Sequence, residues 1–255
     1  MTALPRLPTQ RLDGRRALVS GGTRGIGLGA AIALASAGAD VTILARSAET
    51  IEEATDALAR DGLTISGVVL DVTDNAAVTA FLVPQPAFDI LVNSAGMARH
   101  GPFLDVSEAD YDAVLDLNLK ALFFLSQAVA ARLVAEKRPG SIIHVSSQMG
   151  HVSGPRRSVS SATKFAVEGL TKAMAIELGP HNIRVNTVCP TFVETELTAK
   201  ALAAEEFRAW VLGKIKLGRL ARVEDIMGPI LFLASDQAAM ITGSALMVDG
   251  GWTAE

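Results

Sequence analysis

The sequence predicts an α/β fold, in which a single doubly wound, Rossmann-type domain carries helices on both faces of a parallel sheet. Three observations lead to this prediction. Short apolar runs alternate with helical stretches, a glycine-rich turn follows the first apolar run, and no linker, repeat or low-complexity segment interrupts the 255 residues. Short, nearly continuous apolar strands are typical of parallel sheets, because helical crossovers bury both faces. We therefore expect one domain over 1–255.

Composition and charge narrow the class of protein. Hydrophobic residues make up 49% of the chain and charged residues 20%, which allows a sizeable core. The net charge of −4 argues against a general nucleic-acid binder. The first sixteen residues hold no apolar signal region, and the apolar run 226–234 is too short to span a bilayer. The chain has a single cysteine, Cys189, which fits a reducing compartment. From these features together we expect a soluble, cytoplasmic protein.

Apolar runs bounded by turn residues predict the strands of the sheet. They cover 16–20, 40–45, 66–71, 89–93, 141–146, 183–188 and 245–249. Helical stretches separate most of these strands, and the clearest of them cover 27–38, 47–62, 107–134 and 160–178. Ser107, followed by Asp110, resembles a capping box at the start of the long helix. Before the last helix and strand we expect an irregular insertion at 191–218.

The turn after the first strand has the composition of a phosphate-binding loop. "SGGTRGIG" at 20–27 places Gly21, Gly25 and Gly27 in a G-x-x-x-G-x-G spacing. Glycine allows the backbone to approach a pyrophosphate closely, and the following helix N-terminus supplies N–H donors. A purely structural tight turn is the alternative, but the strand–turn–helix context favours a dinucleotide site.

The end of the second strand indicates which dinucleotide binds. An NAD site usually has an acidic residue there, which holds the ribose hydroxyls. This sequence instead has Ala45 followed by Arg46, and Arg24 lies inside the glycine turn. Two arginines without an acid suit a 2′-phosphate, so the sequence predicts NADP, with NAD less favoured. The alternative is that both arginines are solvated surface residues.

Seven short motifs follow one another between about Leu12 and Trp252: "SGGTRGIG" at 20–27, "LDV" at 70–72, "NSAG" at 93–96, Asn118 in "LNLKA", "VSS" at 145–147, "CPTFVET" at 189–195 and "VDGGW" at 248–252. In this order they resemble the motifs of the short-chain dehydrogenase/reductase family, in its classical branch. Three positions depart from the family pattern: Ser20 replaces a threonine, Ser94 an asparagine and Thr191 a glycine.

The resemblance implies a seven-stranded parallel sheet and hydride transfer between nicotinamide and an alcohol or carbonyl carbon. In the family a tyrosine is the acid or base, and a lysine four residues later lowers its pKa and binds the nicotinamide ribose. A serine orients the substrate oxygen, and an asparagine holds a proton-relaying water. These roles fall on Asn118, Ser147 and Lys164, with Ser160 at the tyrosine position. Ser147 is chosen over Ser146 because it precedes position 160 by the family's thirteen residues.

The resemblance and the two arginines together define the expected cofactor-binding residues. They are Gly21, Thr23, Arg24, Gly25, Ile26, Gly27, Arg46, Asp71, Val72, Asn93, Ala95, Gly96, Lys164, Pro190, Val193 and Thr195. We expect no metal, because the four histidines are scattered without the spacing of metal ligands.

Ser160 is the departure that bears on chemistry. A serine hydroxyl is a far weaker acid than a phenol, and it is shorter by an aromatic ring. Positioned acid–base catalysis contributes roughly 10²–10⁴-fold to a rate, so we expect impaired activity. The only tyrosine, Tyr111, lies at the start of the long helix, where a structural role is expected.

Three explanations for Ser160 stay open. The chain could be an inactivated variant of an active reductase, with a tyrosine replaced in order to trap a complex. It could be a naturally non-catalytic NADP-binding or assembly protein. Alternatively, Ser160 and Lys164 could form a nucleophile–base pair on one helix face, although no oxyanion hole is evident.

Other polar residues have two interpretations each. His151 could line the substrate pocket, whereas His144 is expected in the core. Arg156 and Arg157 could contact an anionic substrate or lie at a surface or interface. Cys189 is expected to be a buried packing thiol.

The long helix at 107–134 and the helix at 160–178 are apolar on more than one face. In the family these helices pair between subunits, so we expect a homo-oligomer, a tetramer or dimer. The segment 191–218 is expected to be a mobile substrate lid. The substrate is a small alcohol or carbonyl compound, and sugars, sugar acids and polyols all stay open.

Overall fold

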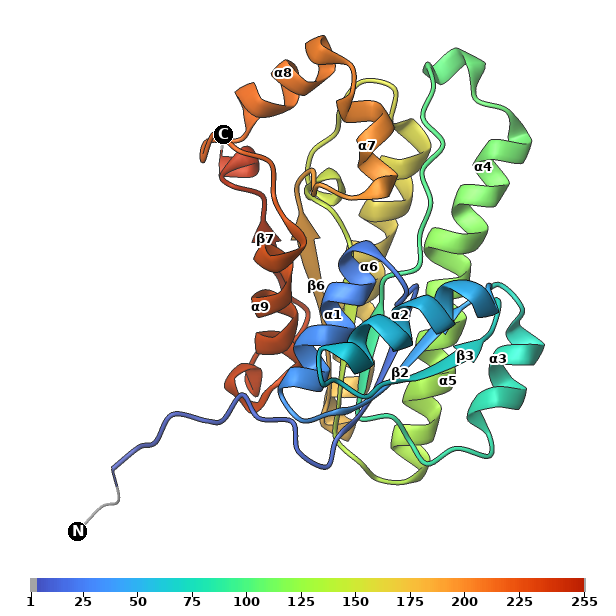
Figure 1. The fold of residues 1–255 in the computed structure, drawn as a ribbon, viewed down its shortest axis with the longest axis vertical. Coiled ribbons are helices and arrows are strands. Elements are labelled where there is room, and N and C mark those ends of the chain that lie inside the picture. Colours follow the sequence, from blue (N-terminus) through green and yellow to red (C-terminus); the bar gives the residue numbers. More distant parts are fainter. Residues whose placement is uncertain (1–3, 255) are drawn as a thin grey trace.

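The computed structural model describes residues 4–254, with the backbone alone at residue 200, and contains a seven-stranded parallel sheet (Figure 1). The strand order is β3-β2-β1-β4-β5-β6-β7. The strands are β1 (Arg16–Ser20), β2 (Asp40–Ala45), β3 (Ser66–Val69), β4 (Ile90–Asn93), β5 (Gly140–Val145), β6 (Ile183–Pro190) and β7 (Ala245–Val248). The predicted fold class and all seven predicted strands are confirmed.

Helices cover both faces of the sheet (Figure 1). One face packs against α1 (Gly25–Ser36), α2 (Ala48–Arg60) and α9 (Val223–Ala234). The other packs against α3 (Asn75–Leu82), α5 (Leu122–Ala135) and α6 (Ser158–Leu178). The remaining α-helices are α4 (Glu108–Leu115), α7 (Glu196–Leu202) and α8 (Glu205–Lys214), with short 3₁₀ turns at Phe103–Asp105, Gln148–Gly150, Gly179–His181, Asp236–Ala238 and Trp252–Ala254.

The inner strand β1 explains why the core has two halves. Leu18 points into the apolar cluster under α5, whereas its neighbours Ala17 and Val19 point into the cluster under α1. All three side chains are fully buried. Because successive side chains of a strand alternate between faces, an apolar run such as "RALVS" serves both cores at once.

The strand order reverses direction between β1 and β4. From β1 the chain first proceeds outward through β2 and β3, then returns to place β4 on the other side of β1. Ligands of open parallel sheets bind beyond the carboxyl ends of the strands at such a switch point. The glycine-rich turn, which follows β1, lies there.

The prediction of an irregular insertion at 191–218 is wrong, because this segment contains α7 and α8. Thr195 forms a capping box with Thr198 at the start of α7, and two glutamates open α8 while Lys214 closes it. These charges suit the helix dipole. Aromatic side chains of this segment pack with Trp252 as a small third core, and the rings belong to Phe192, Phe207, Trp210 and Trp252.

The long helix after Ser107 is continuous but not regular. Ser107 Oγ accepts a hydrogen bond from the backbone N–H of Asp110, 3.1 Å away, as an N-cap should. The Asp110 carboxylate pairs with Arg99 instead of completing the capping box. Between α4 and α5, residues Asp116–Ala121 form a π-helical turn, and isolated π turns occur frequently at functional sites.

The combined segment Glu108–Ala135 is long and apolar enough to cross a membrane by length and composition alone. Its buried side chains, which include Leu125, Val129 and Leu133, pack against the sheet instead. A core helix of this kind satisfies the same length and composition criterion as a membrane span.

Candidate active site

A cleft of about 650 Å³ opens at the carboxyl ends of the strands, beside the glycine-rich turn. This volume is typical of sites for small molecules and cofactors. Most of the residues predicted to bind the cofactor line it, namely Gly21, Thr23, Arg24, Gly25, Ile26, Arg46, Asp71, Val72, Ala95, Gly96, Lys164, Pro190, Val193 and Thr195. The four predicted catalytic residues, Asn118, Ser147, Ser160 and Lys164, line the same cleft.

Two glycines of the turn lie so close to neighbouring backbone that a side chain would not fit. Gly21 has a φ of 67°, and a Cβ atom there would lie 2.9 Å from Ala95 Cα. A Cβ on Gly27 would lie 2.1 Å from Gly21 O, so Gly27 lets the start of α1 pack against the beginning of the turn. Gly27 does not line the cleft. No side chain caps the first turn of α1. The N–H groups of that turn therefore suit the pyrophosphate of a dinucleotide.

Ser20 holds the two sides of the cleft together. Its Oγ accepts hydrogen bonds from the backbone N–H groups of Ser94 and Ala95, each 3.2 Å away. Asn93 lies behind this loop, where its Nδ2 donates to Ser126 Oγ at 2.8 Å. Asn93 is buried and does not line the cleft, so it supports the loop from the core.

Two arginines lie at the end of the cleft near β2, but they differ in their surroundings. Arg46 makes no hydrogen bond or ion pair with another described residue, and Ser47 and Thr50 line the cleft beside it. Arg24 instead pairs with Glu196 of α7, with Nη1 and Oε2 3.1 Å apart. Arg46 is therefore the arginine whose charge is available to a ligand. The serine and threonine were missed because hydroxyl residues at a helix start also act as caps.

Asp71 occupies the predicted position at the end of β3. Its Oδ1 accepts hydrogen bonds from the backbone N–H and the hydroxyl of Thr73, at 2.9 Å and 2.8 Å. The backbone bond to Thr73 lowers the pKa of this carboxyl. Asp71 is therefore ionised and fixed in orientation where it lines the cleft.

Ser147, Ser160 and Lys164 lie together in the cleft, from the end of β5 and the first two turns of α6. Ser147 Oγ donates to Gln148 Oε1 at 2.7 Å and accepts from the Met149 backbone at 3.0 Å. The Ser160 hydroxyl makes no hydrogen bond with a described residue. The backbone oxygen of Ser160 accepts a hydrogen bond from the Thr163 hydroxyl. The Ser160 hydroxyl is thus unconstrained where the family has its phenol.

Lys164 is a partly buried cation next to these hydroxyls. Its Nζ donates to the backbone oxygen of Val145 at 2.7 Å. Burial lowers the pKa of Lys164 to about 8, and the nearby Cys189 and Glu168 oppose this shift. At neutral pH the ammonium group is still protonated, but it exchanges its proton more readily than a surface lysine.

Asn118 faces the cleft from the π-helical turn. Its Oδ1 accepts from the Met97 backbone N–H and its Nδ2 donates to the Met97 oxygen, each at 2.9 Å. Both side-chain groups are therefore used to fix the loop after β4. A Cβ at Gly96 would approach Asn118 Oδ1 to 3.3 Å, so the loop after β4 packs tightly against the π-helical turn.

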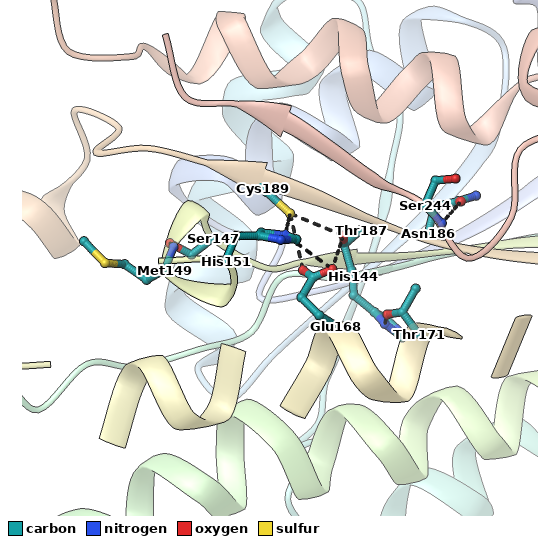
Figure 2. Close-up of polar contacts among 10 residues, drawn as sticks. All are labelled: His144, Ser147, Met149, His151, Glu168, Thr171, Asn186, Thr187, Cys189 and Ser244. Carbon is teal, nitrogen blue, oxygen red and sulfur yellow. Dashed lines mark hydrogen bonds and ion pairs between the residues drawn. The ribbon is translucent and has the colours of Figure 1, made fainter. Parts of the chain in front are cut away.

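A cluster behind the catalytic residues contains His151, Glu168 and Cys189 (Figure 2). Cys189 Sγ donates to Glu168 Oε1 at 3.3 Å and lies 3.5 Å from His151 Nε2. Thr187 donates to the other glutamate oxygen at 3.0 Å. Burial raises the pKa of the Cys189 thiol to about 12, so it is protonated at neutral pH, as expected of a packing thiol. Spacing along the sequence gave no sign of this cluster, because its members come from three separate segments.

Of the two histidines for which the sequence suggested a place, His144 lies where it was expected, and His151 does not line the substrate pocket. His151 turns toward Glu168 and does not line the cleft. His144 lies in the core as expected, with Nδ1 2.9 Å from Thr171 Oγ1, and burial lowers its pKa to about 3. Tyr111, expected to pack structurally, is partly exposed on α4 and does not line the cleft.

The far end of the cleft contains His100, to which the sequence assigned no role, and Arg157, for which contact with an anionic substrate was one of two alternatives. Arg157 is buried beside Phe192, and its Nη1 lies 2.5 Å from His100 Nε2. Both side chains line the cleft. A solvated surface role is therefore wrong for Arg157, whereas Arg156 is exposed.

The Rossmann-type sheet, the uncapped glycine turn and the serine–lysine pair in one cleft define a dinucleotide-dependent oxidoreductase. The family model described as enoyl-(acyl carrier protein) reductase matches residues 21–253. The chain belongs to the short-chain dehydrogenase/reductase family.

Its relatives include enzymes of sugar and sugar-acid metabolism. The chain is 42% identical over 245 residues to D-erythrulose reductase of Gallus gallus, covering 96% of this chain and 98% of the relative. It is 39% identical over 246 residues to gluconate 5-dehydrogenase of Gluconobacter oxydans, covering 95% and 96%.

Solved structures have the same fold. A putative 2-deoxy-D-gluconate 3-dehydrogenase of Agrobacterium tumefaciens with bound NADP superposes with a TM-score of 0.92 at 39% identity, covering 96% of this chain and 99% of the other. A gluconate 5-dehydrogenase of Burkholderia cenocepacia, in complex with NADP and tartrate, has a TM-score of 0.93 at 35% identity, covering 98% and 99%.

Proposed function

We propose that the chain is an NADP(H)-dependent oxidoreductase that transfers a hydride between nicotinamide and a secondary alcohol or ketone of a sugar-like compound. The observation that carries the proposal is the meeting of the glycine turn, Arg46 and the Ser147–Lys164 pair in one cleft. Relatives named for erythrulose, xylulose and gluconate support a sugar-like substrate. The NADP in two structural neighbours supports the cofactor.

The residues of the cleft fit NADP(H) along its length. The close backbone approach at Gly21 and the uncapped first turn of α1 suit a pyrophosphate. Arg46, with the hydroxyls of Ser47 and Thr50, suits a 2′-phosphate, since a guanidinium forms bidentate hydrogen bonds to phosphate oxygens. Lys164 would hold the nicotinamide ribose. When bound, the cofactor supplies or accepts the hydride.

The chain's own residues would orient the substrate and move its proton. The Ser147 hydroxyl would hold the reacting oxygen, and Lys164, with its pKa lowered to about 8, would keep that end of the cleft electropositive. Because both side-chain groups of Asn118 are bound to Met97, a relaying water would use its backbone oxygen. Ser160 is too weak an acid to donate the final proton, so we propose that turnover is impaired.

A naturally non-catalytic NADP-binding or assembly protein is the second candidate, and Ser160 is the observation that favours it. The two proposals differ in one experiment. Changing Ser160 to tyrosine should raise the rate of ketone reduction with NADPH by at least ~10²-fold if a reductase lacks only its acid, with little change in NADPH affinity. A panel of keto sugars, keto sugar acids and simple ketones should be assayed. No gain on any substrate would favour the non-catalytic protein.

We further propose one cytoplasmic dinucleotide-binding domain over 1–255, with 191–218 as the substrate lid and without a metal, membrane or nucleic-acid partner. We also propose a homo-oligomer, a tetramer or dimer, formed through α5 and α6. Large apolar side chains support it, because Phe123, Phe124, Phe165 and Ile176 lie exposed on these two helices.

A further inference from the structure

Arg157 is a buried cation at the end of the cleft away from Arg46. Only 9% of the residue is exposed, and its guanidinium carbon lies 4.9 Å from the ring centroid of Phe192 and 5.3 Å from that of Phe207. Both rings belong to the aromatic cluster described above, and Phe207 lies on α8 itself. The guanidinium is therefore held in place by packing, while the side chain still lines the cleft.

The charge of Arg157 lacks a counter-ion. Among residues 4–254, no carboxylate with a described side chain lies within ion-pair distance of its guanidinium. Its Nε is fully buried without a hydrogen-bond partner, and no described acceptor binds Nη2. Buried charges in proteins are usually paired, because an isolated ion loses its hydration without compensation.

Among the described residues, the one hydrogen-bond partner of the Arg157 guanidinium is neutral. His100 Nε2 lies 2.5 Å from Arg157 Nη1, and since an arginine can only donate, this ring nitrogen accepts. His100 is an exposed residue, but partial desolvation of its ring, together with the positive charge of Arg157, lowers the pKa of His100 to about 4. His100 therefore orients the guanidinium without neutralising it, and the positive charge stays available to an anion that enters the cleft.

A carboxylate fits this position best. The planar guanidinium fork matches the two oxygens of a carboxylate. Ser147, Ser160 and Gln148 line the same cleft and offer hydroxyl and amide groups to a polyhydroxylated chain. The arginines expected to serve the cofactor, Arg24 and Arg46, lie at the other end, near the glycine turn and β2.

We propose that Arg157 binds the carboxylate of a sugar-acid substrate and thereby selects aldonates or keto-aldonates over neutral sugars. This inference rests on the proposed function, because it places the carboxylate at one end of a chain whose secondary alcohol or ketone lies at Ser147. Arg157 thus determines specificity, and His100 is a positioning residue for it.

Matched ligands test the inference without turnover. Protein saturated with NADPH should be titrated calorimetrically with gluconate and sorbitol, which differ only in a carboxylate at C1, and with galactonate and galactitol. No hydride can pass, because ligand and cofactor are both in the reduced form. Each acid should bind at least ~10-fold more tightly than its polyol, the contribution expected of charged hydrogen bonds.

Variants then assign the preference to one side chain. Arg157→Gln should abolish the difference between acid and polyol, and Arg157→Lys should keep part of it, because the charge stays while the fork is lost. Arg156→Gln is the matched control at the exposed neighbouring arginine and should keep all of it. NADPH affinity, which should stay unchanged in every variant, reports that the fold is intact.

Three results would overturn the inference: polyols that bind as tightly as the acids, a preference that survives Arg157→Gln, or sorbitol 6-phosphate binding more tightly than gluconate. The last would show that the site takes phosphates. Failure of the unaltered chain to bind NADPH would count against the proposed function instead.

Discussion

Lys164 Nζ donates a hydrogen bond to the backbone oxygen of Val145, 2.7 Å away at the end of β5. A carbonyl dipole, and not a carboxylate, thus holds the buried ammonium group. The nearby carboxylate, that of Glu168, accepts hydrogen bonds from Thr187 and Cys189. The protein therefore keeps a cation in the cleft at a cost to its own stability, and this cost can be measured.

Replacing Lys164 with methionine should stabilise the protein at pH 7. Burial lowers the pKa of Lys164 from 10.5 to about 8, so below about pH 8 the folded state carries a charge that the unfolded state accommodates better. The gain is at most ~3 kcal/mol. It should shrink above pH 8 and vanish above 10.5, where both states are neutral.

Thermal unfolding across this pH range measures the effect, and Lys172→Met, at an exposed lysine of the same helix, is the control. The Lys164→Met variant should also bind NADPH more weakly than the unaltered protein. A loss of stability at pH 7 would mean that the hydrogen bond to Val145 outweighs the burial of the charge.

Arg46→Asp should shift the cofactor preference. The variant loses the unpaired guanidinium and gains an acid that can hold ribose hydroxyls, so NADPH should bind at least ~10-fold more weakly and NADH no more weakly. Fluorescence titration with both cofactors measures this. Arg60→Asp, at an exposed arginine of α2, should change neither affinity.

Arg24→Gln should have a smaller effect on NADPH than Arg46→Asp. Arg24 already forms an exposed ion pair with Glu196 in the structure, so a smaller part of its charge acts on the cofactor. An equal or larger loss in the Arg24 variant would show that the ion pair opens when the cofactor binds, and would reverse the ranking of the two arginines.

Phe165→Glu should reduce the mass of the assembly. Phe165 is 50% exposed on α6, and a charge at an apolar interface would be desolvated without a partner. Light scattering should give at least twice the chain mass of 26.6 kDa for the unaltered protein and less for the variant. Met240→Glu, at a residue 98% exposed outside α5 and α6, should leave the mass unchanged. A monomeric unaltered chain would refute the proposed assembly.

Cys189 should resist alkylation. Burial raises the pKa of its thiol to about 12, and only the thiolate reacts rapidly. Native protein at pH 8 should therefore react with iodoacetamide far more slowly than protein unfolded in urea, as mass spectrometry can show. Modification at equal rates would mean that the cluster with Glu168 and His151 opens readily.

The sequence predicted the sheet well because apolar runs and glycine turns are local signals. "RALVS" and "DVTILA" became β1 and β2 without any change of boundary. The cofactor end of the cleft was also predictable from local signals, because its residues directly follow the ends of predicted strands. The helices at 191–218 were missed because their pattern mixes charges with aromatic residues. These residues pack against one another and against Trp252, which lies far along the chain.

The substrate end could not be predicted in this way. The sequence left the role of Arg157 open between substrate and surface. Its burial depends on Phe192, which follows β6, and on Phe207 of α8. The cluster of His151, Glu168 and Cys189 likewise joins three segments. Such contacts arise from tertiary packing, which no local pattern records.

The π-helical turn at Asp116–Ala121 makes the long helix sensitive to length. Such a turn accommodates one residue more than an α-helix, and each residue of an α-helix turns the chain by about 100°. Deleting one residue here would leave a regular helix whose earlier half, with Val114, faces a different direction from the one it has now. A one-residue deletion would therefore damage this protein more than most point substitutions nearby, although the helix itself would be unbroken.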